Sequence, residues 1–144
     1  MPRTRLRLQD DRRWGRVSCL SLLRVLTLRV ATKKSLKAKC DKLWSEIIRS
    51  IGYCEMCGSN QNLQAHHIMG RINYSLRWDL RNGICLDASC HTFSRNSAHN
   101  SPLEFAEWFK ANRPEDYEYL LSKKNLLVKP DYEQILNYLQ SEVK

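Results

Sequence analysis

The sequence predicts a small α+β protein in which one strand and several helices surround a group of cysteine and histidine residues. Three observations support this prediction: helical periodicity over residues 36–51, Cys and His motifs between residues 54 and 99, and helical patterns after residue 101. The chain has 144 residues, the size of one ordinary domain. Its hydrophobic share of 42% is typical of a globular protein, so most of the chain should fold.

The first helix is predicted from apolar residues that recur at steps of three and four. These residues are Leu36, Cys40, Leu43, Ile47 and Ile51. They lie on one face of an amphipathic helix, and Gly52 ends it. We interpret Cys40 as a small buried hydrophobic residue, because no other Cys or His lies at ligand spacing beside it.

The first 32 residues have a different composition from the rest of the chain. They hold eight Arg, no Lys and two Asp, and so carry +6 of the formal net charge of +9. Three interpretations stay open: a basic arm that lies on phosphates, an Arg-rich targeting peptide, and upstream sequence included by a mistaken start assignment. We therefore treat residues 1–32 as an Arg-rich head, disordered or a start-site artefact, and assign it no function.

The sequence offers no secretory signal and no membrane span. The apolar stretch of the head contains Arg24 and Arg29, and it is too short and too charged to cross a bilayer. In a reducing compartment, clustered Cys and His residues are metal ligands more often than disulfides. We expect a cytoplasmic protein without a membrane partner, whose basic balance favours an anionic partner such as nucleic acid.

Two cysteine motifs predict a structural zinc site. The segment "CEMCGSNQ" has the CxxC form of a zinc knuckle, with Gly58 directly after the second Cys, and "CLDASCH" follows thirty residues later. Cys is the better zinc ligand, whereas Asp87 has the CxxC-like spacing to the last Cys, so the fourth ligand stays open. The predicted ligands are Cys54, Cys57, Cys90 and either Cys85 or Asp87. Disulfide bonding is the alternative that this spacing disfavours.

Three histidines are expected to converge near the zinc site. His66 and His67 are neighbours in "AHHIMG", and adjacent side chains on an extended strand point to opposite faces, so they should have different roles. His91 directly follows Cys90. A zinc ion that ties residues 54–57 to Cys90 would carry His91 close to the strand, which predicts a functional site rather than simple packing.

The segments "CEMC", "AHHI" and "NGICLDASCH", in this order, resemble the HNH endonucleases, and phage-encoded members in particular. The resemblance covers about residues 44–110. It implies a ββα-metal fold, in which a two-stranded hairpin and one helix surround a divalent cation. With it, the expected architecture becomes an N-terminal helix and a zinc-clipped HNH nuclease domain within residues 33–112, followed by a helical C-terminal cover over residues 113–144.

The same resemblance implies roles for individual residues. His66 and His91 would bind the catalytic metal, His67 would be the general base, and Asn82 would hold the hairpin loop in shape by hydrogen bonds. Many relatives have a further His at the position of Arg95, where this sequence departs from the pattern. We interpret the nearest candidate, His99, as either a third metal ligand or a phosphate contact.

The implied activity is hydrolysis of phosphodiester bonds in DNA, leaving 5′-phosphate and 3′-hydroxyl ends, in phage or mobile-element biology. Mg²⁺ or Mn²⁺ is the expected catalytic ion and Zn²⁺ the structural one, although imidazole ligands also admit Zn²⁺, Co²⁺ or Ni²⁺ at the catalytic position. The alternative is a zinc-stabilised nucleic-acid-binding module without catalysis. The presence of both His67 and Asn82 favours the enzyme.

The segment between the histidine pair and Asn82, "MGRINYSLRWDLR", mixes arginines with aromatic residues. Its candidate nucleic-acid contacts are Arg71, Arg77 and Arg81, interleaved with Tyr74 and Trp78. Such a mixture suits a nucleic-acid backbone. The alternative is a solvated charged loop that a buried Trp78 pins to the protein.

Three helices are predicted in the last third of the chain. In "SPLEFAEWFKANRP", Ser101 is the expected N-cap, Pro102 the first helical residue and Glu104 the partner in a capping box. The apolar side of this helix should cover the metal module with Phe105, Trp108 and Phe109. Two further helices are expected in "PEDYEYLLSKK" and "KPDYEQILNYLQSEV".

Overall fold

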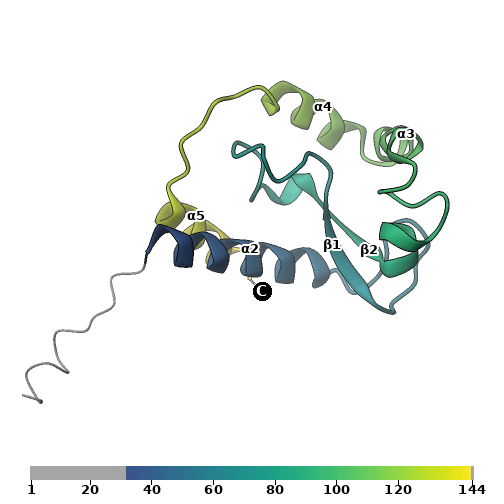
Figure 1. Ribbon diagram of the computed structural model, residues 1–144, viewed down its shortest axis with the longest axis horizontal. Coiled ribbons are helices and arrows are strands. Elements are labelled where there is room, and N and C mark those ends of the chain that lie inside the picture. Colours follow the sequence, from purple (N-terminus) through teal and green to yellow (C-terminus); the bar gives the residue numbers. More distant parts are fainter. Residues whose placement is uncertain (1–31, 144) are drawn as a thin grey trace, which may run out of the picture. The chain divides into compact units, whose positions relative to one another are not determined.

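The structure, a computed structural model, describes residues 32–143, so the predictions for the Arg-rich head lie outside the described residues. A mixture of helices with one small antiparallel sheet confirms the predicted α+β class (Figure 1). The elements, in chain order, are α2 (Lys33–Arg49), β1 (Leu63–His67), the 3₁₀ turn η1 (Leu80–Asn82), β2 (Gly83–Asp87), the π turn η2 (Ser89–Phe93), α3 (Pro102–Asn112), α4 (Pro114–Lys123) and α5 (Tyr132–Ser141).

Strands β1 and β2 form a two-stranded antiparallel hairpin at the centre of the fold. In its register His66 lies opposite Ile84 and His67 lies opposite Gly83. A side chain at Gly83 would collide with Ile48 and with the ring of Trp44, so the missing Cβ allows α2 to pack directly on the hairpin. This close approach fixes the distance between α2 and the histidine pair.

Helix α2 begins where Thr32 accepts a hydrogen bond from the backbone N–H of Ser35 at 3.2 Å. It ends before Gly52, whose φ of +82° lies in the left-handed region that favours glycine. The helix packs against α5, and its buried residues join a cluster formed by Cys40, Trp44, Trp78 and Leu139. Cys40 is therefore a buried apolar residue, as predicted.

A second apolar cluster lies between the hairpin and the helices α3 and α4. Its buried members are Cys54, Leu76, Ile84, Leu86, Ala98, Phe105, Phe109 and Leu120. The predicted apolar face of α3 is thus confirmed. The predicted capping box is wrong, because the hydroxyl of Ser101 donates to the carbonyl oxygen of Arg95 at 3.0 Å instead of capping the helix.

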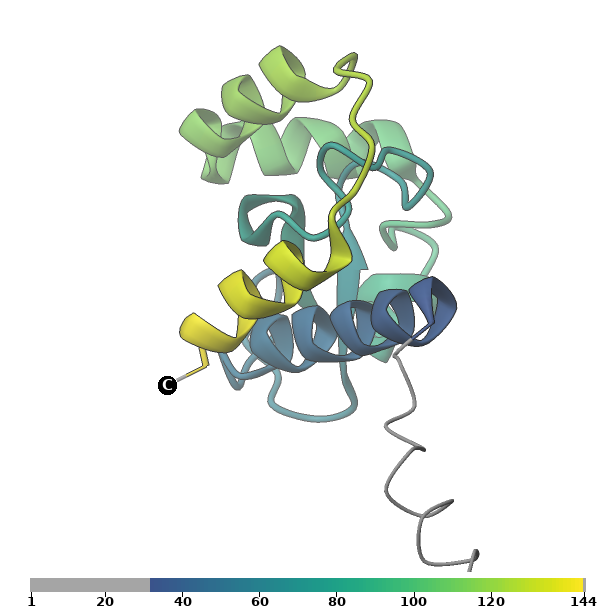
Figure 2. The same ribbon diagram turned by 90° about the vertical axis from the view of Figure 1, so that its left-hand side faces the viewer.

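The C-terminal helices belong to the same compact unit as the hairpin, which spans Ala31–Lys144. Figures 1 and 2 show α5 lying beside α2, with α3 and α4 on the other side of the hairpin. The segment expected to act as a cover thus contributes to both clusters, through Leu120 of α4 and Leu139 of α5. Among the described residues, no helix has both the length and the apolar character that crossing a bilayer requires.

Candidate functional site

Three thiols and one carboxylate come together beside the end of the hairpin. The possible ligand atoms of Cys54, Cys57, Asp87 and Cys90 all lie within 4.8 Å of one another. The thiol of Cys57 donates to Oδ2 of Asp87 at 2.8 Å, and the backbone N–H of Cys90 donates to Oδ1 at 2.7 Å. This donor set could hold a metal ion of the kind that accepts sulfur ligands.

Local backbone structure aims these four side chains at one point. The backbone N–H of Gly58 donates to the carbonyl oxygen of Cys54 at 2.8 Å, and Gly58 has a φ of +77°, which closes the tight turn. Strand β2 ends at Asp87, and the turn η2 begins two residues later and contains Cys90. The backbone N–H of Glu55 donates to the carbonyl of Cys85 at 2.9 Å and holds the two halves together.

Cys85 is not part of this cluster, and its inclusion among the zinc ligands is corrected. The alternative, Asp87, occupies the fourth position. Cys85 lies two residues earlier on β2, about 7 Å along the strand, too far from the end of the hairpin to join the other three. It is fully buried, and burial raises the pKa of its thiol to about 11, so the thiol stays protonated at neutral pH.

The three clustered thiols have different electrostatic surroundings. Burial raises the pKa of Cys54, but the backbone N–H groups of Asp87, Cys57 and Met56 outweigh it, so the net pKa is lowered. The pKa of Cys57 is raised by its hydrogen bond to Asp87, and that of Cys90 is raised by burial and by the neighbouring thiols. Because metals bind thiolates, loading this cluster must release protons.

A second group of possible ligands consists of His66, His91 and His99, whose ring nitrogens lie within 4.8 Å of one another. Nε2 of His99 lies 3.1 Å from Nε2 of His91. The ring of His66 lies 5.0 Å, centroid to centroid, from each of the other two rings. His66 and His91 are partly buried and His99 is exposed, so the group opens to solvent on the side of His99.

Gln64 orients one of these imidazoles, and the sequence interpretation missed it. Its side-chain oxygen accepts a hydrogen bond from Nδ1 of His91. An amide oxygen only accepts, so Nδ1 of His91 carries the proton and Nε2, which lies next to Nε2 of His99, keeps the lone pair. The one signal in the sequence is spacing: Gln64 lies two residues before His66 and so shares its face of β1.

His66 is held in its neutral form. Burial, with the nearby His91 and His99, lowers its pKa to about 3. The ring also meets Phe105 of α3 edge-on, with 5.2 Å between ring centroids. At neutral pH the lone pair of His66 is therefore available to a cation. His99 lies beside the two ligand candidates His66 and His91, as the interpretation of His99 as a third metal ligand requires.

His67 lies in a different environment, on the α2 side of the strand. Its ring stacks on Trp44 with the centroids 3.8 Å apart and the planes at 17°. Nε2 lies 2.9 Å from the carbonyl oxygen of Arg77, which can only accept, so Nε2 carries the proton and Nδ1 has the lone pair. Burial lowers its pKa to about 4, so the ring is neutral at pH 7.

Asn82 connects the two ends of the loop between the strands. Its side-chain amide is fully buried, and Nδ2 donates to the carbonyl oxygens of Met69 and Leu76, each at 3.0 Å. Oδ1 accepts from the backbone N–H of Met69 at 2.6 Å. Asn82 therefore satisfies backbone groups that the loop would otherwise bury without partners, which fits a residue that shapes the hairpin loop.

Arg77 has a structural role in place of the predicted phosphate contact. It is 8% exposed, and Nε and Nη2 donate to the two carboxylate oxygens of Asp41 at 2.9 and 2.8 Å. Nη1 donates to the carbonyl oxygen of Arg71 at 2.7 Å, and the buried Trp78 also donates to Asp41, at 2.8 Å. The loop is thus pinned by Trp78, as the alternative interpretation held, and the guanidinium of Arg77 is not available to a ligand.

The other two candidate arginines differ in their partners. Nε of Arg81 donates to Asp116 at 2.5 Å, and its guanidinium lies 4.3 Å from the centroid of the Tyr119 ring. Arg71 is exposed, and within residues 32–143 its side chain makes no ion pair. Of the three, Arg71 is therefore the one whose charge faces solvent without a carboxylate partner.

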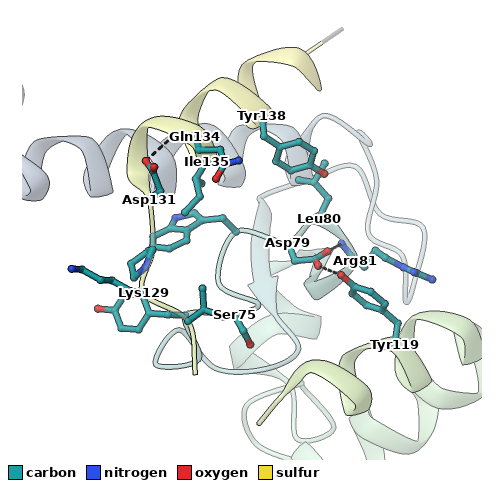
Figure 3. A pocket seen from close by; sticks show the side chains of 14 residues that line it. Ser75, Asp79, Leu80, Arg81, Tyr119, Lys129, Asp131, Gln134, Ile135 and Tyr138 are labelled. Carbon is teal, nitrogen blue, oxygen red and sulfur yellow. Dashed lines mark hydrogen bonds between the residues drawn. The ribbon is translucent and has the colours of Figure 1, made fainter. Parts of the chain in front are cut away.

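A cavity of about 520 Å³ lies between α4, α5 and the start of η1 (Figure 3). Its wall includes Asp79, whose carboxylate accepts a hydrogen bond from the hydroxyl of Tyr119 at 2.7 Å. None of the clustered cysteines or histidines lines it. The cavity is therefore separate from both groups of possible metal ligands.

Comparison of the chain with known protein families, with curated proteins and with solved structures finds no match. The evidence on function therefore lies in the chain's own residues: the two groups of possible metal ligands and the separate environment of His67.

Proposed function

We propose that the protein is a metal-dependent endonuclease of the HNH type that hydrolyses phosphodiester bonds in DNA, and that it derives from a phage or mobile element. One observation carries the proposal: two adjacent imidazoles have different partners. His66 lies beside His91 and His99, whereas His67 stacks on Trp44 and hydrogen-bonds to a backbone carbonyl. One imidazole can thus bind a cation while its neighbour accepts a proton.

The proposed base is Nδ1 of His67. Hydrolysis of a phosphodiester needs a group that takes a proton from the attacking water. The carbonyl of Arg77 fixes the tautomer that leaves Nδ1 without a proton, and stacking on Trp44 fixes the plane of the ring. The pKa of about 4 describes the free protein, and an anionic phosphate beside the ring would raise it toward the range in which a base works best.

The proposed catalytic metal site is the group of His66, His91 and His99. It offers three ring nitrogens, and Gln64 presents one of them in the required tautomer. A divalent ion bound there would stabilise negative charge on the phosphate and on the leaving oxygen. Within residues 32–143 this group includes no carboxylate, so Mn²⁺, Co²⁺, Ni²⁺ or Zn²⁺ fits its donors better than Mg²⁺.

The proposed role of Cys54, Cys57, Asp87 and Cys90 is to bind a structural Zn²⁺. Three sulfurs and one carboxylate complete a tetrahedral set without an open position, the arrangement of a structural site. Cys90 and His91 are neighbours in η2. Holding Cys90 against the knuckle therefore keeps His91 beside the strand that carries His66.

The proposal is tested by cleavage of supercoiled plasmid by the full chain, with Mn²⁺, Co²⁺ or Mg²⁺ added and with the added ion omitted. Omission is the better control, because EDTA would also strip the cysteine cluster. We expect ion-dependent nicking that His67→Ala lowers by about 100-fold or more, while Gln140→Ala, an exposed change on α5, leaves it intact.

Two results would contradict the proposal. The first is DNA binding by the wild-type chain without cleavage in any of these ions, which would favour a binding module without catalysis. The second is equal cleavage by the wild type and His67→Ala, which would remove His67 from the reaction.

A further inference from the structure

An exposed apolar patch lies at the tip of the loop between β1 and η1. Ile72 is 90% exposed, and Leu127, between α4 and α5, is fully exposed. We call these two residues, together with Leu126 and Val128, the Ile72 patch. The patch lines a shallow hollow of about 420 Å³, whose other lining residues are Asn73, Tyr74, Lys124 and Asn125. Large apolar side chains grouped on a surface mark a contact site more often than scattered ones do.

The loop that presents Ile72 is fastened in place. Nδ2 of Asn73 donates to the carbonyl oxygen of Lys124 at 2.6 Å, and the hydroxyl of Ser75 donates to the carbonyl oxygen of Lys123 at 3.0 Å. These bonds tie the loop to the end of α4. Ile72 is therefore held out to solvent by a hydrogen-bonded support, which lowers the entropy cost of using it in a complex.

Cations outnumber carboxylates around the patch. The lining of the hollow includes Lys124 and no carboxylate. Residues 68–78 and 121–130 contain five cations, and the nearest acids along the chain, Asp79 and Asp131, line the neighbouring cavity. Four of the cations are exposed, namely Arg71, Lys123, Lys124 and Lys129. A second copy of the chain docked symmetrically here would place these cations against one another, at an electrostatic cost. The positive charge of these four side chains instead complements a polyanion such as a nucleic acid.

The patch connects to the proposed base through two hydrogen bonds. The carbonyl oxygen of Arg71, the residue before Ile72, accepts from Nη1 of Arg77 at 2.7 Å. The carbonyl oxygen of Arg77 in turn accepts from Nε2 of His67 at 2.9 Å. On the other side, Nζ of Lys37 in α2 donates to the hydroxyl of Tyr74 at 3.2 Å. The backbone beside Ile72 is thus linked through Arg77 to the ring of His67.

We infer that the Ile72 patch docks DNA, with Ile72 acting as an apolar wedge between bases and Lys123, Lys124 and Lys129 holding phosphates. Apolar side chains that insert at a base step unstack it and kink the duplex. This inference rests on the proposed function and deepens it. It names the substrate class as DNA that opens or kinks at the bound step, so a duplex with a bulge or mismatch should bind better than a regular one.

The test uses short duplexes that carry 2-aminopurine, regular or beside a single-base bulge, with the full zinc-loaded chain and no other ion added. The fluorescence of 2-aminopurine rises when the base loses its stacking, so the assay reports binding and base opening without cleavage. Ile72→Ala should abolish the fluorescence rise and weaken binding roughly fivefold to tenfold. Circular dichroism of the variant checks that this exposed change leaves the fold intact.

The matched control is Ile51→Ala, which removes the same side chain at a surface position where Ile51 is 43% exposed. Ile51 lies beyond the end of α2, about 20 Å along the helix axis from the position of Lys37. The Ile51→Ala variant should bind the 2-aminopurine duplex and unstack its base like the wild type. A second variant, Lys124→Ala, should weaken binding and reduce its salt dependence while keeping the fluorescence rise in the bound complex.

Each outcome separates the docking inference from the nuclease proposal. If Ile72→Ala binds and opens the duplex like the wild type, or if the wild type binds none of the duplexes, the inference is overturned. If Ile72→Ala loses base opening while no ion supports cleavage by the wild type, the inference stands and the nuclease proposal fails. If the wild type sediments as a dimer that Ile72→Ala dissociates, with DNA binding unchanged, the patch is a contact between copies and the inference is wrong.

Discussion

Arg77 contacts His67 through its backbone and not through its charged side chain. The carbonyl oxygen of Arg77 accepts from Nε2 of His67 at 2.9 Å, while the guanidinium is bound by both carboxylate oxygens of Asp41 in α2. Helix α2 thus holds His67 in two ways, by the stacking of Trp44 on the ring and by the ion pair that fixes the carbonyl. The first helix is therefore a part of the candidate site rather than an attachment to it.

Replacing Asp41 with Ala should lower the free energy of unfolding by about 2–4 kcal/mol. The change leaves the guanidinium of the buried Arg77 without its carboxylate, and the indole N–H of Trp78 loses its acceptor as well. Urea denaturation measures the effect. The matched control is Lys42→Ala, which breaks an exposed pair with Glu46 at 3.8 Å and should cost less than about 0.5 kcal/mol. Equal losses in the two variants would contradict the structural role of the Asp41–Arg77 pair.

The sequence predicts the candidate site where ligands lie in short motifs. Cys54 and Cys57 are three residues apart, and Cys90 and His91 are neighbours, so local spacing alone indicates what they do together. The sequence does not predict the orienting contacts. Gln64 is 27 residues from the histidine that it contacts, a distance at which no local pattern connects two polar side chains.

Arg77 shows a second limit of sequence interpretation. In the sequence it alternates with other arginines and aromatic residues, a pattern that fits a nucleic-acid surface. Its partner Asp41 is 36 residues away on another element, and only the folded chain shows that the pair is buried. The composition of a loop therefore predicts its charge but not which of its charges face solvent.

Metal content should distinguish the four clustered ligands from Cys85. On the proposal that this cluster binds a structural metal, Cys57→Ser and Cys90→Ser should lose that metal and unfold at lower temperature, because each removes one proposed ligand between the knuckle and the end of β2. Cys85→Ser should keep one metal ion per chain, since its thiol lies outside the cluster. Elemental analysis of the purified chains measures this. Loss of metal in Cys85→Ser, with retention in Cys90→Ser, would return Cys85 to the ligand set.

Replacing Gln64 with Ala should weaken metal binding at the histidine group by about 10-fold to 100-fold. The change removes the acceptor that fixes the tautomer of His91, so Nε2 no longer carries the lone pair in every molecule. Titration of the zinc-loaded chain with Co²⁺, followed by visible absorption, measures the affinity. Gln61→Ala, an exposed change just before β1, is the control and should bind Co²⁺ like the wild type. An unchanged affinity in Gln64→Ala would show that the amide does not orient the ring.

The stability of the zinc-loaded chain, with no ion at the histidine group, should fall as the pH drops from 6.5 toward 5. Burial lowers the pKa of His66 to about 3 and that of His67 to about 4, so the folded chain keeps both rings neutral in this range. The unfolded chain protonates both below its usual histidine pKa of about 6.5, and it therefore binds more protons than the folded one. Each histidine adds at most about 1.4 kcal/mol per pH unit to the slope. Above about pH 8 the unfolded chain no longer binds these protons, so the contribution is constant. Between pH 6.5 and 5, urea denaturation of His67→Gln should give a shallower slope of stability against pH than the wild type. An identical slope in the two chains would mean that His67 titrates alike in the folded and unfolded states.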